Sequence, residues 1–276
     1  MHLAQAKIEQ YQQQGFLCPI RVLSPQEAAE CRTRLEAAEA AHRNGPLAKK
    51  LSQKPHLLFT WLDALVRNDA VLDADEDVIG PDILCWGGSF FTKEAQTDDF
   101  VSWHQDLTYW GLEPADIVTA WVALSPSTPE SGCMRVVPGS HHQDVVPHTE
   151  TFAAQNLLSR GQEVQVEVDE AAAADLVLQP GEMSLHHVKL IHGSNPNRSD
   201  DRRIGYAIRY IPASVRQTAG AEDSAMLVRG VDRYRHFIPE HPPAADLDDA
   251  ALAEHDAVLA RQHRILYRGT HLQDYR

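Results

Sequence analysis

The chain has 276 residues, of which 43% are hydrophobic, so it can bury a substantial core as one domain. Its formal net charge of -14 argues against a nucleic-acid partner, whose phosphates need a basic surface, and against adsorption to anionic lipid. The first residues lack an apolar signal core, and no run approaches the roughly 18 apolar residues of a membrane span. We therefore expect a soluble, cytoplasmic protein.

Helices are expected at both ends of the chain. Ser24, Pro25 and Glu27 form a capping box with proline at the first helical position, which predicts a helix over residues 28–42. Residues 56–66 and 68–79 have the composition of two further helices, the second capped by Asn68. After a loop at residues 239–243, a last helix is expected over residues 246–262, where it would cover one edge of the core.

From residue 81 the sequence changes to short runs rich in β-branched and aromatic residues, separated by turn residues. Such runs predict the strands of a sandwich or barrel. We expect a single domain with a helical lead-in (1–80), a β core (81–212) and a C-terminal cover (213–276). The predicted strands cover residues 83–93, 101–104, 117–124, 133–137, 164–168, 175–178, 183–188 and 204–211.

The most informative motif is His104-Gln105-Asp106. A histidine and a carboxylate two positions apart on an extended segment point to the same side, so both can bind one metal ion. His142-Gln143-Asp144 repeats this spacing, but it follows the turn residues Pro138-Gly139-Ser140 and lies in a polar stretch typical of a surface loop. Aromatic and aliphatic residues surround the first copy, which is therefore the candidate ligand pair.

A second histidine, far along the chain, can complete this site. Arg203 follows His192 by eleven residues and opens the apolar run 204–211, which predicts a strand next to that of His192. Two imidazoles and one carboxylate on one face of an octahedral ion are the ligands of non-haem Fe(II) oxygenases, and they leave positions for water, O2 and a bidentate cosubstrate. A guanidinium can bind the far carboxylate of an organic acid bidentately. The sequence thus predicts an iron site at His104, Asp106 and His192, with Arg203 in a dicarboxylate site beside it.

Four ordered segments resemble the phytanoyl-CoA dioxygenase family of Fe(II)/2-oxoglutarate-dependent oxygenases. They are residues 103–106, 117–124, 132–141 and 192–203, within a region from about 83 to 210. The resemblance implies a mainly β fold with flanking helices, built on a double-stranded β-helix (a jelly-roll, cupin-like core). It also implies that 2-oxoglutarate chelates the iron, that Arg203 and Ser194 bind its far carboxylate, and that Trp121 walls its pocket.

Other residues are candidates on weaker grounds. Lys93 matches a region where family members place a basic residue toward the cosubstrate, although it can equally be a solvated lysine on an edge strand. Either His186 or His187 must face inward from its strand, and we expect His187 to line the site without binding the metal. Three aromatic residues near the first motif either line the substrate pocket or only pack: Trp103, Tyr109 and Trp110.

The resemblance implies hydroxylation of an unactivated C–H bond with release of succinate and CO2. Related halogenases lack a carboxylate at the position of Asp106, so hydroxylation is preferred over chlorination. The acidic chain offers no basic platform for coenzyme A phosphates, which favours a small polar metabolite, such as a natural-product intermediate or an aminoalkyl phosphonate. Two alternatives remain at this point: a zinc-dependent hydrolase, or a non-catalytic metal-binding protein on the same barrel.

Overall fold

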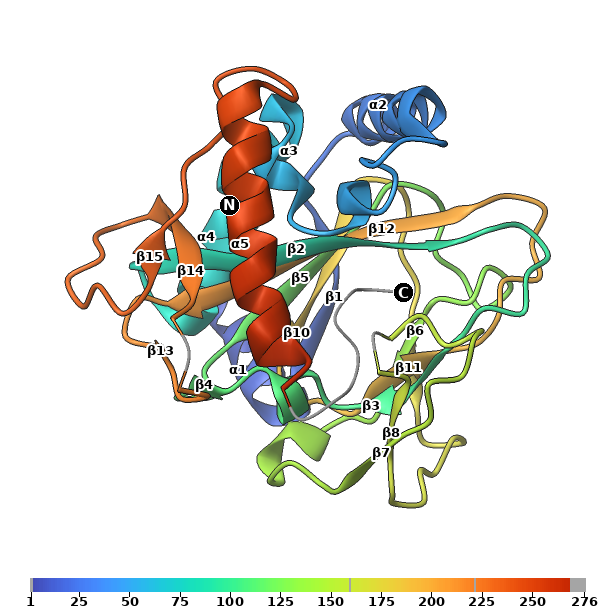
Figure 1. Cartoon of the computed structure of the whole chain (residues 1–276). Coiled ribbons are helices and arrows are strands. Elements are labelled where there is room, and N and C mark those ends of the chain that lie inside the picture. The colour runs from blue at the N-terminus through green and yellow to red at the C-terminus, as the bar shows by residue number, and fades with distance from the viewer. Residues whose placement is uncertain (1, 159, 221, 269–276) are drawn as a thin grey trace.

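Two sheets face each other across the centre of the molecule (Figure 1). The computed structural model describes residues 2–158, 160–220 and 222–268. The large sheet has the order β1 (Phe16–Arg21), β10 (Glu182–His187), β5 (Val118–Ala123), β12 (Arg203–Pro212), β2 (Ile83–Lys93), β14 (Ser224–Arg229) and β15 (Ile238–Pro239). The small sheet has the order β3 (Val101–His104), β11 (His192–Ser194), β6 (Met134–Val136) and β9 (Ala174–Leu176).

Two short strand pairs lie outside these sheets, β4 (Leu112–Glu113) with β13 (Arg216–Gln217) and β7 (His148–Glu150) with β8 (Gln162–Val164). The helices are α1 (Gln5–Gln14), α2 (Pro25–His42), α3 (Thr60–Val66), α4 (Asp69–Ile79) and α5 (Asp249–Leu266). Short 3-10 turns lie at Lys50–Ser52, Pro55–Leu57, Asp106–Tyr109 and Ser140–His142. The mainly β architecture with flanking helices agrees with the sequence-based expectation.

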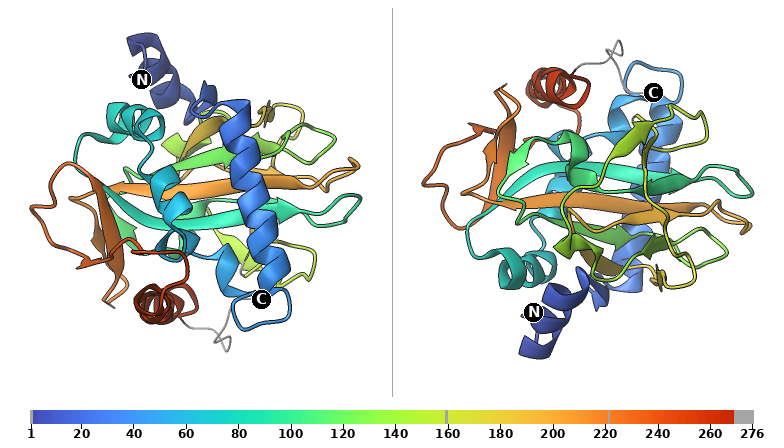
Figure 2. Two further views of the ribbon diagram at one scale, coloured as in Figure 1. Left: turned by 90° about the horizontal axis from the view of Figure 1, so that it is seen from above. Right: turned by 90° about the horizontal axis from the view of Figure 1, so that it is seen from below.

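Each face of the large sheet packs against a different layer. Figure 2 shows α2 across β2 and β12 in the view from above, and in Figure 1 the labelled strands of the small sheet, β3, β11 and β6, lie on the opposite side from α2. Successive side chains of β12 point alternately toward these two layers, because neighbouring residues of a pleated strand lie on opposite faces of the sheet. Ile204, Tyr206 and Ile208 enter the core that α3 and α4 cover, whereas Arg203 and Ala207 line a pocket between the two sheets.

Most predicted elements are confirmed. The strands at 83–93 and 101–104 have the predicted bounds, and α2 carries the capping box, in which Ser24 and Glu27 each bind the other's backbone N–H. The side chain of Asn68 caps α4, as expected. Helix α5 starts a few residues later than predicted, because its N-cap is Asp248, and it continues to Leu266.

The predicted helix over residues 56–66 is wrong in its first half. Residues 55–57 form a 3-10 turn, Phe59 is extended, and α3 begins only at Thr60. The carboxylate of Asp246 accepts the N–H of Thr60 at 2.7 Å. The start of α3 is thus fixed by a residue far along the chain, which local sequence cannot reveal. The strand expected at 164–168 is also misplaced, since β8 ends at Val164.

Strands from outside residues 81–212 also belong to the large sheet. Strand β1, inside the expected helical lead-in, forms the edge of the large sheet and pairs with β10. Strands β14 and β15, in the expected cover, extend the opposite edge. None of the helices in the described parts of the chain combines the length and apolar character that a membrane span requires.

Candidate metal centre

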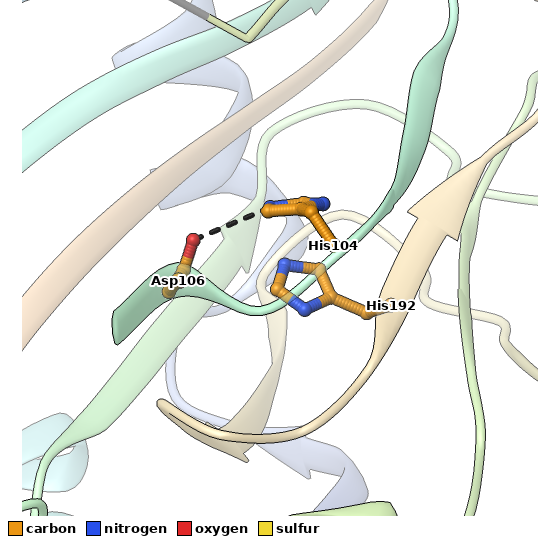
Figure 3. A group of neighbouring side chains, drawn as sticks. All are labelled: His104, Asp106 and His192. Atoms are coloured by element: carbon orange, nitrogen blue, oxygen red, sulfur yellow. Dashed lines mark ion pairs between the residues drawn. The ribbon is translucent and has the colours of Figure 1, made fainter. Parts of the chain in front are cut away.

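His104, Asp106 and His192 converge between the two sheets (Figure 3). One ligand atom from each lies within 4.8 Å of the others. His104 and His192 are opposite each other in the pairing of β3 with β11, and their ring centroids are 4.1 Å apart. The backbone of Gln105 is extended, so the carboxylate of Asp106 returns to the side of His104, with 3.3 Å between His104 Nε2 and Asp106 Oδ1.

The backbone orients both imidazoles. His104 Nδ1 lies 2.9 Å from the carbonyl oxygen of Ser102, and His192 Nδ1 lies 2.9 Å from that of Leu190. A carbonyl can only accept, so each Nδ1 carries the proton and each Nε2 presents a lone pair to the centre. This is the tautomer that a metal ligand needs.

Burial and charge set the protonation states that suit a cation. Burial lowers the pKa of His192 well below its usual value, which favours the neutral, metal-binding imidazole. Burial alone would raise the pKa of Asp106, but the polar surroundings supplied by His104, His192 and Arg209 outweigh it and lower that pKa. Two lone pairs and one carboxylate therefore face a common point, and this donor set fits a divalent ion such as Fe(II).

Gln105 supports the centre from outside, a role that sequence reasoning missed. Its side chain is fully buried, donates to the carbonyl of Lys189 at 2.8 Å and accepts the N–H of Val146 at 2.8 Å. Its own N–H donates to Nε2 of His148 at 3.0 Å. Gln105 thereby ties the first motif to the segment that leads into β11. The signal available in the sequence was the position of Gln105 between the two ligands of the motif.

The second copy of the motif lies elsewhere. His142 is exposed, with its Nε2 3.2 Å from the carbonyl oxygen of Gln13, and Asp144 is exposed as well. Over the described residues, the triad of His104, Asp106 and His192 is the one metal-binding group found. The choice between the two copies, made on turn residues and polarity, agrees with this geometry.

Beside the triad lies a pair of buried cations. Lys93 and Arg203 are opposite each other in the pairing of β2 with β12 and are 0% and 2% exposed. Lys93 Nζ donates to Ser194 Oγ at 2.6 Å and to the carbonyl of Asn195, while Arg203 Nη1 donates to the carbonyl of Gly132 at 2.9 Å. Lys93 is therefore not a solvated lysine on an edge strand.

Burial makes the positive charge on each of these two side chains costly. Burial, together with the charge of Arg203, lowers the pKa of Lys93 to about 6, and burial lowers the pKa of Arg203 to about 10. Arg203 Nε is buried without a hydrogen-bond partner. Like charges directly opposite each other destabilise a sheet pair. An anion bound between them would remove this cost.

Arg202, the residue before Arg203, faces outward instead and forms a salt bridge with Glu39 at 2.9 Å.

Trp121 walls the same pocket. The guanidinium carbon of Arg203 lies 5.2 Å from the centre of its ring. Glycine at position 205 makes room for this ring, because a Cβ there would lie 1.8 Å from Trp121 Cζ2. The pocket between the sheets is lined by Phe91, Val101, His104, Asp106, Thr119, Trp121, Met134, His186, His192, Gly193, Ser194, Arg203, Ala207 and Arg209.

The expectation that His187 lines the site is wrong; its neighbour His186 does. In the pairing of β10 with β5, His186 is opposite Thr119, which lines the pocket, whereas His187 is opposite Val118, which enters the core under the helices. His186 Nε2 is 3.9 Å from Asp106 Oδ2, and burial lowers the pKa of His186 to about 4. The ring of His187 lies instead beside that of His141, at 5.3 Å between centroids.

The structure places the three aromatic candidates, Trp103, Tyr109 and Trp110, in different surroundings. Trp103 is not among the residues that line the pocket, and the guanidinium of Arg135 stacks on its ring at 5.5 Å, which favours the alternative that Trp103 only packs. The physical reason is an irregular register between β3 and β11, which brings both Val101 and His104 to the inner side. Tyr109 and Trp110 line a second cavity that adjoins the metal centre.

The family follows from comparison with known proteins. The sequence profile of the phytanoyl-CoA dioxygenase family matches residues 11–205. The chain belongs to this family. Its members are Fe(II)/2-oxoglutarate-dependent oxygenases, so the predicted class of enzyme and its cofactors, Fe(II), 2-oxoglutarate and O2, are confirmed at the level of the family.

Individual known proteins resemble the chain to different extents. A probable alpha-ketoglutarate-dependent hypophosphite dioxygenase of Stutzerimonas stutzeri is 32% identical over 181 residues, and the match covers 62% of this chain and 62% of that protein. The chain thus spans less than two thirds of that relative's length. The L-proline trans-4-hydroxylase of Streptomyces griseoviridis is 25% identical over 231 residues, covering 75% and 86% of the two chains. The solved structure of apo ThoJ, a non-heme monooxygenase, is 38% identical, covers 94% of this chain and 96% of its own, and has a TM-score of 0.84.

Proposed function

We propose that this chain is an Fe(II)/2-oxoglutarate-dependent dioxygenase that hydroxylates an unactivated C–H bond of a small polar metabolite. His104, Asp106 and His192 bind the iron. Arg203, Lys93 and Ser194 bind the far carboxylate of 2-oxoglutarate, and Trp121 walls its pocket. The two facing sheets then form a double-stranded β-helix, and the whole chain acts as one catalytic domain.

The observation that carries this proposal is the pair of buried cations behind the metal triad. A metal-binding triad alone suits many reactions, but Lys93 and Arg203 lie side by side, almost without exposed surface, in the same pocket. Keeping two cations out of water is costly unless an anion compensates them, and without one burial and the charge of Arg203 lower the pKa of Lys93. A dicarboxylate that reaches from the metal to these cations meets both requirements at once.

When bound, iron, 2-oxoglutarate and O2 supply the oxidant for a C–H bond, and one oxygen atom enters the substrate as hydroxyl while 2-oxoglutarate becomes succinate and CO2. The protein's residues bind and orient. The backbone carbonyls of Ser102 and Leu190 hold the two imidazoles, and Gln105 holds the carboxylate-bearing turn. Burial of the triad excludes bulk water from the reacting atoms.

The names of two relatives support a small polar substrate, since one acts on hypophosphite and the other on L-proline. A zinc-dependent hydrolase on the same barrel is the alternative with some support, because three ligands and an open position also suit zinc. That function leaves the pair of Lys93 and Arg203 without a task, and we therefore favour the oxygenase.

The test begins under anaerobic conditions with protein loaded with Fe(II). Addition of 2-oxoglutarate should produce a weak visible charge-transfer band, and admission of O2 should release succinate. His104→Ala should lose the band and bind metal far more weakly, while the matched control His142→Ala should keep both properties. A protein that retains zinc through purification and develops no band with iron would favour the hydrolase.

A further inference from the structure

The wall of the metal pocket contains a further histidine, His186. It lies on β10, which pairs with β1 on one side and with β5 on the other, so its backbone is held between two neighbouring strands. Its side chain is 1% exposed and lines the pocket between the two sheets. The proposed binding of metal and cosubstrate does not use this imidazole.

His186 lies beside two of the three metal ligands. Its ring is next to that of His192, with 4.8 Å between the ring centroids. Its Nε2 lies 3.9 Å from Asp106 Oδ2. The other oxygen of the same carboxylate, Oδ1, has a different neighbour, because it lies 3.3 Å from His104 Nε2. The two oxygens of Asp106 are therefore flanked by different imidazoles.

His186 nevertheless stands outside the set of metal ligands. Among the described residues, the ligand atoms that all lie within 4.8 Å of one another belong to His104, Asp106 and His192. Carboxylates that bind metals in proteins are themselves hydrogen-bonded by neighbouring groups, which fix their direction. An imidazole beside Asp106 that is not a ligand is suited to this task.

The surroundings of His186 favour a proton on Nε2. A carboxylate oxygen can only accept, so the contact with Asp106 is attractive when Nε2 carries the hydrogen and Nδ1 presents a lone pair. Thr119 is opposite His186 in the pairing of β10 with β5 and is 1% exposed. Its hydroxyl and His186 Nδ1 are both buried without a hydrogen-bond partner in the described structure. Opposite Cβ atoms lie about 5 Å apart, so this hydroxyl can turn to donate to Nδ1.

The distance between His186 Nε2 and Asp106 Oδ2 exceeds an N–H···O hydrogen bond by about 1 Å. The last side-chain torsions of histidine and aspartate have broad minima, so a small turn of the ring or of the carboxylate covers this distance. A carboxylate that binds a cation through one oxygen leaves its other oxygen free to accept a hydrogen bond. His186 is the imidazole beside that second oxygen.

We propose that His186 is a positioning residue of the metal centre, whose Nε2–H donates to Asp106 Oδ2 and so directs Oδ1 toward the metal. This inference rests on the metal site of the proposed function and deepens it. Carboxylates bind metal ions through one oxygen or through both. Engaging Oδ2 prevents Asp106 from taking, with its second oxygen, a position that the cosubstrate or O2 needs.

The first experiment measures the affinity of the protein for Ni(II) by competition with a coloured chelator. His186→Phe keeps a ring against His192 but has no donor, and it should weaken Ni(II) binding about tenfold to a hundredfold. His186→Gln should recover most of this loss, because its side-chain amide N–H can take the place of the Nε2–H. His187→Phe, at the adjacent residue outside the pocket, is the matched control and should bind Ni(II) like wild type.

Two results of this experiment would overturn the inference. One is equal Ni(II) affinity of wild type and His186→Phe. The other is His186→Gln as weak as His186→Phe, because a ring that only packs against His192 has no need of a donor. Circular dichroism of each variant checks that it is folded.

A second measurement uses the wild-type protein and therefore does not depend on the folding of a variant. Long-range ¹H–¹⁵N NMR spectra of protein loaded with diamagnetic Zn(II) distinguish the tautomers of each imidazole and the nitrogens that bind metal. His186 should carry its hydrogen on Nε2, whereas His104 and His192 should carry theirs on Nδ1 and bind the metal through Nε2. A hydrogen on Nδ1 of His186, or metal binding by His186 itself, would contradict the positioning role.

The inference and the proposed function can fail separately. If the Fe(II) protein develops the charge-transfer band with 2-oxoglutarate while His186→Phe binds Ni(II) like wild type, only the positioning role is wrong. If Ni(II) binding depends on His186 as predicted but no band develops, the oxygenase proposal is wrong and the positioning role stands.

Discussion

Lys93 has an environment that its residue type rarely tolerates. It is fully buried, faces Arg203 across two paired strands, and has its pKa lowered to about 6 by burial and by that neighbour. Near neutral pH much of this amine is therefore uncharged in the ligand-free protein. A bound carboxylate favours the ammonium form and raises the pKa again.

This shift gives the binding of 2-oxoglutarate a pH dependence of known sign. Between the pKa of the free protein, about 6, and the higher pKa of the complex, binding takes up protons, so the affinity falls as the pH rises. Calorimetric titration of Ni(II)-loaded protein at about pH 8, in two buffers of different ionisation enthalpy, measures this uptake. Lys93→Gln should remove most of it and weaken binding. Identical heats in both buffers would show that Lys93 does not charge on binding.

Strand β12 depends on one close approach to its neighbour β5. Gly205 lies against the ring of Trp121, and a Cβ there would come within 1.8 Å of a ring atom. Gly205→Ala must therefore displace Trp121 or the strand, and we expect a loss of about 1–3 kcal/mol in the free energy of unfolding. Chemical denaturation followed by circular dichroism measures it.

Gly87, on the adjacent strand β2, is the matched control. A Cβ at that position would meet only Gln262 Nε2, at 3.8 Å, so Gly87→Ala should leave stability nearly unchanged. If the two variants are equally stable, Trp121 can move without a cost in free energy. That result would contradict the assignment of Trp121 as a fixed wall of the cosubstrate pocket.

A buried ion pair connects distant parts of the molecule. Lys54 precedes the turn that leads into α3, Glu240 follows β15, and their side chains are 1% and 0% exposed with 2.5 Å between Nζ and Oε1. Ser224 Oγ donates to the same carboxylate at 2.7 Å. The pair fixes the N-terminal helical segment to the far edge of the large sheet.

Glu240→Gln should leave a buried cation without its counter-charge and reduce the free energy of unfolding by about 3–5 kcal/mol. The double variant Lys54→Met, Glu240→Leu replaces both charges with apolar groups and should recover much of this loss. Denaturant titration of the three proteins tests both statements. A single variant as stable as wild type would contradict the role of the pair.

The sequence alone determined the features that depend on local chemistry and spacing. The capping box of α2, the cap at Asn68, the strand at 83–93 and the choice of His104 and Asp106 over His142 and Asp144 all follow from residues close together in the chain. So does the choice of Arg203 over Arg202, because only one of two neighbouring residues in a strand can face inward and the offset of eleven residues from His192 favours Arg203.

Only the tertiary structure decided which way the remaining side chains point and what they meet. His186 rather than His187 faces the metal ligands because β10 pairs with β5 in one register. Lys93 is buried because Arg203 and the small sheet cover its strand, and Asp246 sets the start of α3 from far away. Period-two alternation has two possible phases, and contacts between distant segments select one of them. The pair of His104 and Asp106 depends on spacing within one segment and could be predicted, whereas the inward side of β10 depends on that selection and could not.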